Sequence, residues 1–499
     1  MKHNFFLNKF FEQRLPTYWL VVIIIIGHVH AILFYGATFG VDAQVYIILS
    51  QLFESAQKAQ TIIADPKLWI YTDHIPLGEP FVWYLVSKLP TSAIWPALAF
   101  LQHFIGAVSQ IYLFSTLNTI RSRRLLVIPC VLMSFFPFYQ TMHNSLLTEA
   151  ISGACFLVAM AACLRLAHAP RKRDYVYLAL SGLGAFFRVY IVTAPLFGLF
   201  LLFSFRKIRF MKAAALGCLC ILGLTLSSAW IFGMTGQLWV PNFGLSAMWD
   251  DSIHSPATPA AVTAYADTLP WPDEATKQRL FSGDFRRFEA IAVSSCWAKS
   301  GMTKKQAMDT AQKISTLFRE QPGQWKRQLT AALVCMGIPE ATLLPRQWQH
   351  GRHPELEKER TFRRGGDSKY FSWITPDEPF YNTLTSMPWF PDTPGHSLFK
   401  AAWKPYLKFS TPERVKDIFG LSHIPLGIWA LLGLGACVFM LARGNTFPGI
   451  LFTGLFLIFF SLFYSINIPM DRYSYHAVLL YFTAISTAVA MQQKKKLNV

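Results

Sequence analysis

The sequence predicts an all-α polytopic membrane protein with about ten transmembrane helices, a surface helix in the first outer loop and a large extracytoplasmic loop domain. The 499 residues are 53% hydrophobic and only 15% charged, and the mean hydropathy is +0.32. Several apolar runs, including the uncharged stretches 18–36 and 447–466, reach the roughly 18 residues that call for a membrane-spanning helix. Basic residues gather in short segments between such runs. These three observations define the fold class.

The first apolar run is interpreted as a retained span. It is too long for the apolar core of a signal peptide, and no small-residue cleavage site follows it. The predicted spans are 18–38, 92–117, 124–140, 146–166, 175–188, 190–205, 212–234, 422–442, 446–466 and 473–491.

The distribution of basic residues orients these spans. The formal net charge is +18, and 18 of the 46 Lys and Arg residues fall in short segments that we place on one side of the membrane. They are Lys2, Lys9, Arg14, Arg121, Arg123, Arg124, Arg165, Arg171, Lys172, Arg173, Arg206, Lys207, Arg209, Lys212, Arg443, Lys494, Lys495 and Lys496. Because Lys and Arg are enriched on the cytoplasmic side, both termini are predicted to be cytoplasmic. The basic charge therefore reports topology and does not favour nucleic-acid binding.

The same rule predicts a pair of short helices in the middle of the N-terminal half. Asp174 with its basic neighbours and the cluster at 206–209 must both face the cytoplasm. The apolar stretch between them therefore crosses outward and returns, with a turn near Arg188. Ten crossings then bring the C-terminal lysines back to the cytoplasm.

Three parts of the chain follow from this topology. They are an N-terminal transmembrane module over 1–234 with the first outer loop at 39–91, an extracytoplasmic soluble domain over 235–421, and C-terminal transmembrane helices over 422–499. The soluble domain holds 19 of the 28 acidic residues, which is typical of a water-facing module.

Three features of this domain can be interpreted further. The stretch 304–333 predicts a helix with a break at Pro322 and Gly323. The pair Asp250–Asp251 is interpreted as an exposed turn rather than a metal-binding pair. Cys296 and Cys335 could form a disulfide in an oxidising compartment, although spacing alone cannot establish a bridge.

The first outer loop begins with an unusually placed acid. Asp42 follows the first span closely, and a charge at the edge of a membrane is unfavourable unless it is used or paired. A half-apolar stretch at helical spacing follows it, which predicts a helix along the membrane surface. Few acids lie outside the soluble domain, and the predicted cytoplasmic face has hardly any. Acid–base or metal chemistry is therefore expected on the outer face.

The membrane part resembles the GT-C glycosyltransferases that use polyprenyl-phosphate sugars as donors. This group includes the protein mannosyltransferases and the aminoarabinose transferase of lipid A. The features that carry the resemblance are Asp42 with its surface helix, the segment 75–81 (IPLGEPF), the segment 147–149 (LTE), the segment 183–188 (LGAFFR) and the segment 471–473 (DRY). The resemblance does not extend to the large extracytoplasmic loop domain at 235–421.

The resemblance implies a role for each matching position. Asp42 would be the general base or would orient the acceptor hydroxyl, and Glu149 would line the same cavity. Arg188 and Arg472 would hold the donor phosphate, because guanidinium groups suit phosphate oxygens. Further substrate contacts are expected from Tyr473, His143 and His74.

Some relatives carry two adjacent acids after the first span, whereas Ala43 follows Asp42 here. This departure leaves open whether the site takes a divalent cation such as Mg²⁺ or Mn²⁺, because hard cations need several oxygen ligands.

Structural roles are alternatives for several of these residues. Asp42 could cap its helix, and Glu149 could form a buried structural bridge with Arg188. The histidines His28, His30 and His103 lie within spans and are interpreted as packing residues.

The leading hypothesis is an inverting glycosyltransferase of a bacterial inner membrane with an extracytoplasmic active site. It would move sugar from a polyprenyl phosphate to a lipid, glycan or protein acceptor. The alternatives are a transporter or flippase of a lipid-linked saccharide, which usually shows related halves, and a non-catalytic envelope scaffold.

Overall fold

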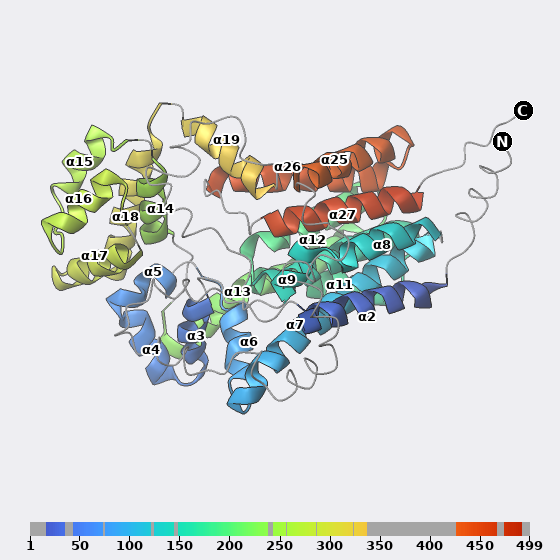
Figure 1. Ribbon diagram of the computed structural model, residues 1–499, viewed down its shortest axis with the longest axis horizontal. Helices are drawn as coiled ribbons and strands as arrows, with labels where there is room; N and C mark the ends of the chain where they lie inside the picture. Colours follow the sequence, from blue (N-terminus) through green and yellow to red (C-terminus); the bar gives the residue numbers. More distant parts are fainter. Residues whose placement is uncertain are drawn as a thin grey trace, which may run out of the picture.

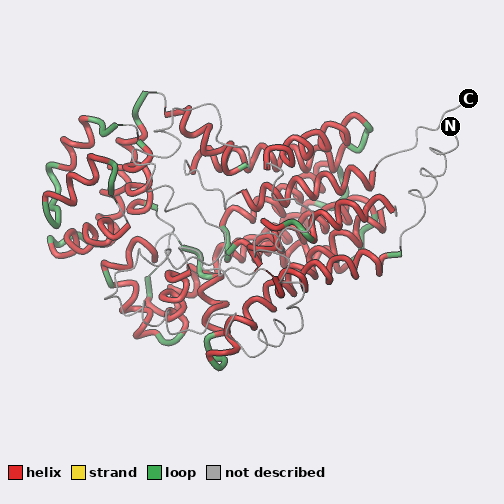
Figure 2. Tube along the Cα trace, in the orientation of Figure 1, coloured by secondary structure: helices red, strands yellow, loops and turns green. Residues whose placement is uncertain are grey.

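The computed structural model describes residues 16–34, 43–72, 75–120, 124–143, 148–237, 243–255, 257–285, 287–322, 324–336, 426–466 and 474–491. Within these ranges the regular elements are helices and no strand is present, as Figure 2 shows. The prediction of an all-α protein is confirmed.

Helices lie at the positions of the predicted spans. They are α2 (Thr17–Phe34), α7 (Thr91–Ile120), α10 (Glu149–His168), α13 (Phe210–Thr235), α25 (Leu426–Ala442), α26 (Thr446–Ile466) and α27 (Ser474–Met491), together with shorter helices given below. By length and composition, four segments of the described chain are suited to cross a membrane, namely Ala97–Ile120, Glu149–His168, Phe210–Thr235 and Thr446–Ser465. Further apolar helices are shorter: Thr17–Ile32, Arg124–Ser134, Val189–Ser204, Gly427–Ala442 and Tyr475–Met491.

The predicted span 124–140 is not one continuous helix. The short η3 (Arg124–Leu126) leads into α8 (Val127–Ser134), and α9 (Pro137–His143) follows. Phe135 leaves the helical conformation, with φ −113° and ψ 10°. Pro137 has no N–H to continue the hydrogen bonds of α8, but its fixed φ suits the first turn of a new helix. The proline therefore divides this span.

The paired short helices around Arg188 are present. The outgoing arm is α11 (Lys172–Ser181) with η4 (Gly182–Phe186), and the returning arm is η5 (Val189–Val192) with α12 (Thr193–Ser204). Helix α13 crosses this pair closely, because a Cβ on Gly223 would lie 2.2 Å from the carbonyl oxygen of Gly182. Small residues permit such backbone approach between membrane helices. The two glycines therefore seat the arm that leads to Arg188 on α13.

Helix α10 is the centre of the bundle. It packs against α7, α11, α12 and α27 and is buried along nearly its whole length. Its many small residues allow neighbours to approach, and a Cβ on Gly153 would lie 2.4 Å from a ring carbon of Tyr475. The position of α10 therefore brings residues from four other helices close to its two ends.

One end of the bundle gathers the start of α2 and the end of α27. Asn118 of α7 donates a 2.9 Å hydrogen bond to the Thr17 hydroxyl of α2, and Asn445 donates to the carbonyl oxygen of Met491 at 3.5 Å. Near the C-terminal end of α10, Arg165 forms a buried ion pair with Asp174. Glu149 begins the same helix sixteen residues earlier (165 − 149), which corresponds to about 24 Å of helix. Glu149 therefore lies at the opposite end of the bundle.

The segment predicted as the first outer loop folds into short helices. They are α3 (Ala43–Ser50), η1 (Gln51–Phe53), α4 (Ala56–Ala64), η2 (Pro66–Leu68), α5 (Trp69–Thr72) and α6 (Gly78–Val86). A helix is present at the position of the predicted surface helix, namely α3, and Ser55 caps the later helix α4 through its hydroxyl, which accepts from the Lys58 N–H. The apolar side chains of α3 are buried against α6, and Trp230 of α13 donates to the Leu52 carbonyl oxygen at 3.2 Å.

A second group of helices lies at the far end of the molecule from the apolar bundle (Figure 1). It contains α14 (Gly244–His254), α15 (Ala260–Ala266), α16 (Glu274–Ser282), α17 (Arg287–Lys299) and α18 (Lys304–Arg319). Trp297 and Phe318 are fully buried in its core. The group contacts the first outer loop through Ser294, whose hydroxyl donates to the Pro66 carbonyl oxygen at 2.7 Å.

Helix α19 (Gln324–Cys335) follows α18 after the predicted break and packs against α26. Tyr481 of α27 donates a hydrogen bond to the Met336 carbonyl oxygen just after α19. In the structure Cys335, at the end of α19, is not joined to Cys296 of α17.

The prediction of an exposed turn at Asp250–Asp251 is wrong. Both residues lie within α14 and are buried. The Asp251 carboxylate accepts hydrogen bonds from Ser315 Oγ at 2.5 Å and from Arg319 Nε at 2.8 Å. A buried carboxylate needs such partners, so this acid joins α14 to α18.

Candidate functional site

Three of the seven site residues predicted from the sequence can be placed, namely Glu149, Arg188 and His143. The other four, Asp42, His74, Arg472 and Tyr473, lie outside the described residues.

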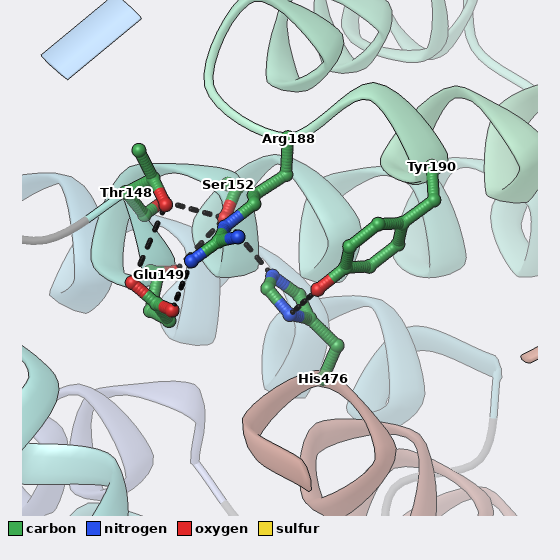
Figure 3. A network of polar contacts seen from close by, with 6 residues as sticks. All are labelled: Thr148, Glu149, Ser152, Arg188, Tyr190 and His476. Carbon is green, nitrogen blue, oxygen red and sulfur yellow. Dashed lines mark hydrogen bonds and ion pairs between the residues drawn. The ribbon is translucent and has the colours of Figure 1, made fainter. Parts of the chain in front are cut away.

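Glu149 and Arg188 form a buried ion pair, drawn in Figure 3. Arg188 Nη2 donates to Glu149 Oε1, and the exposed fractions of the two side chains are 13% and 1%. Thr148 Oγ1 donates to the other oxygen of Glu149 at 3.3 Å. Glu149 is also the first residue of α10, where the helix dipole stabilises a negative charge. The predicted structural bridge therefore exists, and its geometry is equally suited to presenting Arg188.

Arg188 reaches Glu149 because the chain turns there. It lies between η4 and η5 with an extended backbone, at φ −145° and ψ 110°. Its N–H donates to the Gly184 carbonyl oxygen at 2.8 Å, which closes the outgoing arm. The turn predicted from the charge distribution thus places a guanidinium group beside the start of α10.

His476 joins the segments that carry the ion pair. Its Nε2 lies 2.9 Å from Ser152 Oγ, and its Nδ1 lies 2.9 Å from the Tyr190 hydroxyl (Figure 3). Ser152 gives its single hydroxyl proton to the Thr148 carbonyl oxygen at 2.6 Å, so it accepts from His476 Nε2–H. Nδ1 of the neutral ring then accepts from Tyr190. The ring therefore connects α27 both to the first turn of α10 and to the segment after Arg188.

A second buried carboxyl group, that of Glu79, approaches from α6. A Cβ on Gly78 would lie 2.7 Å from the Phe186 carbonyl oxygen, so the start of α6 lies against the arm that ends at Arg188. Glu79 is 0% exposed, and Gln102 Nε2 of α7 donates to its Oε1 at 3.2 Å. Burial raises the pKa of Glu79 well above 4.5, and the negative charge of Glu149 raises it further, while Gln102 and Arg188 act in the opposite direction.

His143 belongs to a cluster of buried histidines, together with His28 and His103. The centroids of the three rings lie 5.2 to 5.3 Å apart, and Nδ1 of His28 and Nδ1 of His103 are 2.9 Å apart. Nδ1 of His143 is 3.0 Å from the Tyr139 carbonyl oxygen. The Tyr139 ring stacks on Tyr475, the neighbour of His476, at a centroid distance of 5.9 Å. The cluster thus adjoins the His476 contacts, but His143 does not contact the ion pair.

The third histidine interpreted as a packing residue, His30, lies on α2, the same helix as His28. The ring of His30 contacts that of Phe135 at a centroid distance of 5.8 Å.

No group of three or more His, Cys, Asp or Glu side chains in the described ranges is arranged to hold a metal ion. Whether Asp42 would contribute an oxygen ligand to a cation stays a prediction, because Asp42 lies outside the described residues.

Sequence reasoning missed several members of this site. Glu79 was part of the segment 75–81 but received no role, and Gln102, Ser152, Tyr190 and His476 were not considered. A usable signal was their polarity, because polar side chains within spans are unfavourable unless they are paired or functional.

Comparisons with models of protein families, with curated proteins and with solved structures find no match for this chain. The functional interpretation therefore depends on the chemistry of the site.

Proposed function

We propose that the protein is a membrane glycosyltransferase of the GT-C type, which moves a sugar from a polyprenyl phosphate to a lipid, glycan or protein acceptor. The observation that supports this most is the buried pair Glu149–Arg188 beside a second buried carboxyl group, Glu79. A guanidinium group held by a carboxylate at a helix end is suited to binding a phosphate.

The proposal includes ten spans in a bacterial inner membrane, with both termini in the cytoplasm. The ends of the helices support this orientation, because Arg165 and Asp174 lie at the same end of α10 as the basic segment at 171–173. Glu149 and Arg188 are then extracytoplasmic, where the lipid phosphate of an outward-facing donor would lie.

The transfer requires one base and one phosphate site. The acceptor hydroxyl oxygen attacks the anomeric carbon, and the bond from that carbon to the phosphate oxygen breaks. The electron pair leaves on the lipid phosphate, and the carboxylate of Asp42 takes the hydroxyl proton. Attack opposite to the leaving group inverts the anomeric configuration. Because the leaving group is a phosphate, positioning supplies most of the remaining catalysis.

Arg188 would hold the donor phosphate, and Glu149 would orient the guanidinium group of Arg188. A guanidinium group has five donor hydrogens, so it can bond to Glu149 and to phosphate oxygens at the same time. Arg472 is proposed as the second phosphate contact, and Tyr473, His74 and His143 stay candidates for further substrate contacts. A divalent cation (Mg²⁺ or Mn²⁺) remains open, and loss of transfer on chelation followed by recovery with either metal would establish it.

The test is transfer of labelled sugar from a lipid-linked donor by purified protein in detergent. We expect Asp42→Asn to lose at least about 100-fold in activity, the lower range for loss of a general base. We expect Arg188→Lys to lose activity as well, because an ammonium group cannot reproduce the planar fork of a guanidinium group on a phosphate. The matched control is Glu54→Gln, which removes an acid of the same loop whose partner is Lys58 on the surface. Full transfer by Asp42→Asn at normal expression would refute the assignment of the base.

The transporter alternative is favoured by one observation, the cluster of His28, His103 and His143, since buried histidines in spans also occur in proton relays. Turnover of donor in detergent, where no second compartment exists, separates the two functions. If the protein neither turns over donor in detergent nor transports it in vesicles, the envelope scaffold is the alternative that remains.

A further inference from the structure

Glu79 is a buried acid whose surroundings do not match an ionised carboxylate. Its side chain is fully buried, and Oε1 accepts one hydrogen bond, from the neutral amide of Gln102. Oε2 is equally buried and has no hydrogen-bond partner among the residues that the structure describes. A carboxylate removed from water needs a paired cation or several donors, because its desolvation is otherwise uncompensated.

The nearby cation is already used by another acid. Arg188 donates to Glu149, whose carboxylate is also supported by Thr148 and by the start of α10. Two ionised carboxylates sharing one guanidinium group would repel each other, which favours a proton on the less supported one. That one is Glu79, and the raised pKa of its carboxyl group agrees with this assignment.

We infer that Glu79 is a neutral, protonated hydrogen-bond donor of this site, and that it donates to a phosphoryl oxygen of the ligand that Arg188 binds. The inference rests on the proposed function for the identity of the ligand. With Glu79 neutral, the charges of Glu149 and Arg188 cancel, so a phosphate can approach. With Glu79 ionised, the three side chains would carry a net negative charge and repel it.

The protonation of Glu79 depends on the charged groups that face it. Among the described residues, those coupled to it are Glu149 of α10 and Arg188. Helices α3 and α7 also pack on α6, and the titratable side chains that they add are Tyr46 and, on the nearer half of α7, His103.

The first experiment is infrared difference spectroscopy of the purified full-length protein at neutral pH, which detects the C=O stretch of a protonated carboxyl group. We expect Glu79→Gln to remove one such band and Glu54→Gln, at an exposed position, to remove none. A spectrum that is unchanged in Glu79→Gln would refute the protonated state.

The second experiment measures binding of sugar-free polyprenyl monophosphate in detergent across a pH series. Wild-type affinity should fall, relative to that of Glu79→Gln at the same pH, as the pH rises through the pKa of Glu79. This ratio cancels the titration of the lipid phosphate itself. At neutral pH we expect Glu79→Ala to lose about tenfold in affinity, the value of one hydrogen bond, and Glu79→Gln to lose less, because its amide can donate.

Two results would overturn the donor role, namely equal losses for Glu79→Gln and Glu79→Ala, or a ratio that does not depend on pH. If wild-type protein binds no polyprenyl phosphate, the proposed function and this ligand both fail. The infrared result would then still decide the protonation of Glu79, so the two failures are distinguishable.

Discussion

Removing the ion pair between Glu149 and Arg188 as a unit should separate its structural role from its functional role. Arg188→Met leaves a carboxylate that is 1% exposed without its cation, and breaking such a pair costs about 3–5 kcal/mol. The helix dipole still supports Glu149 by up to about 1 kcal/mol, which places the expected loss near the lower end of that range. The double variant Glu149→Gln/Arg188→Met leaves no buried charge, so we expect it to recover about 2 kcal/mol relative to the sum of the single losses.

The assay combines equilibrium unfolding in detergent with transfer of labelled lipid-linked sugar. The matched control is the partly buried pair of α14 and α18, for which Asp251→Asn/Arg319→Met should lose stability but keep transfer. We expect the double variant at Glu149 and Arg188 to be folded and inactive. A folded double variant that transfers sugar at the wild-type rate would show that the pair is only a structural bridge, and it would refute the proposed phosphate site.

Three further perturbations test the surroundings of this pair. Gly223→Ala should destabilise the protein by about 1–3 kcal/mol, because the new Cβ would meet the Gly182 carbonyl oxygen. The control is Gly233→Ala on the same helix, which has no neighbour within 4 Å and should be neutral or stabilising. Equal unfolding free energies for the two variants would contradict the close crossing of α13 and η4. His476→Phe removes the hydrogen bonds to Ser152 and Tyr190 and should lose about 0.5–1.5 kcal/mol of stability for each. A folded His476→Phe variant that keeps wild-type transfer would show that the ring acts only in folding. The stability contributed by protonated Glu79 is complete below its unfolded pKa near 4.5 and is lost as the pH rises through the raised pKa of the folded state. The Glu79→Gln variant should therefore gain stability relative to wild type with increasing pH. A difference in unfolding free energy that does not depend on pH would contradict this.

The sequence was sufficient to predict the turn at Arg188 and its possible pairing with Glu149 in the candidate site. The rule that basic segments stay on one side required the chain to turn between Asp174 and the cluster at 206–209, and the turn lies at Arg188. Because Glu149 starts the preceding long apolar helix, pairing between the two was already a possible structural role. Both steps depend on the order of charges along the chain, which a sequence displays directly.

The rest of the candidate site depends on contacts between distant segments. His476 is 324 residues from Ser152 and 286 from Tyr190, so no local pattern relates them. The partner of Asp251 is Arg319, on another helix, and without it the acid was interpreted as an exposed turn. Tertiary packing decides which polar side chains share a buried space, and hydrophobic periodicity does not contain that information.

The buried acids at the two ends of α10 have different hydrogen-bond partners, and this difference agrees with the proposed site at the Glu149 end. Asp174 is as buried as Glu79, but both of its oxygens accept hydrogen bonds, from the Tyr112 hydroxyl at 2.9 Å and from the Arg171 N–H at 2.8 Å. Glu79 has one oxygen that lacks a partner within the described part of the chain. Buried polar atoms are nearly always paired, and an exception requires an explanation such as a catalytic role. A fold that satisfies the acid at one end of a helix can do so at the other, and we infer that Glu79 stays incomplete because a ligand oxygen completes it.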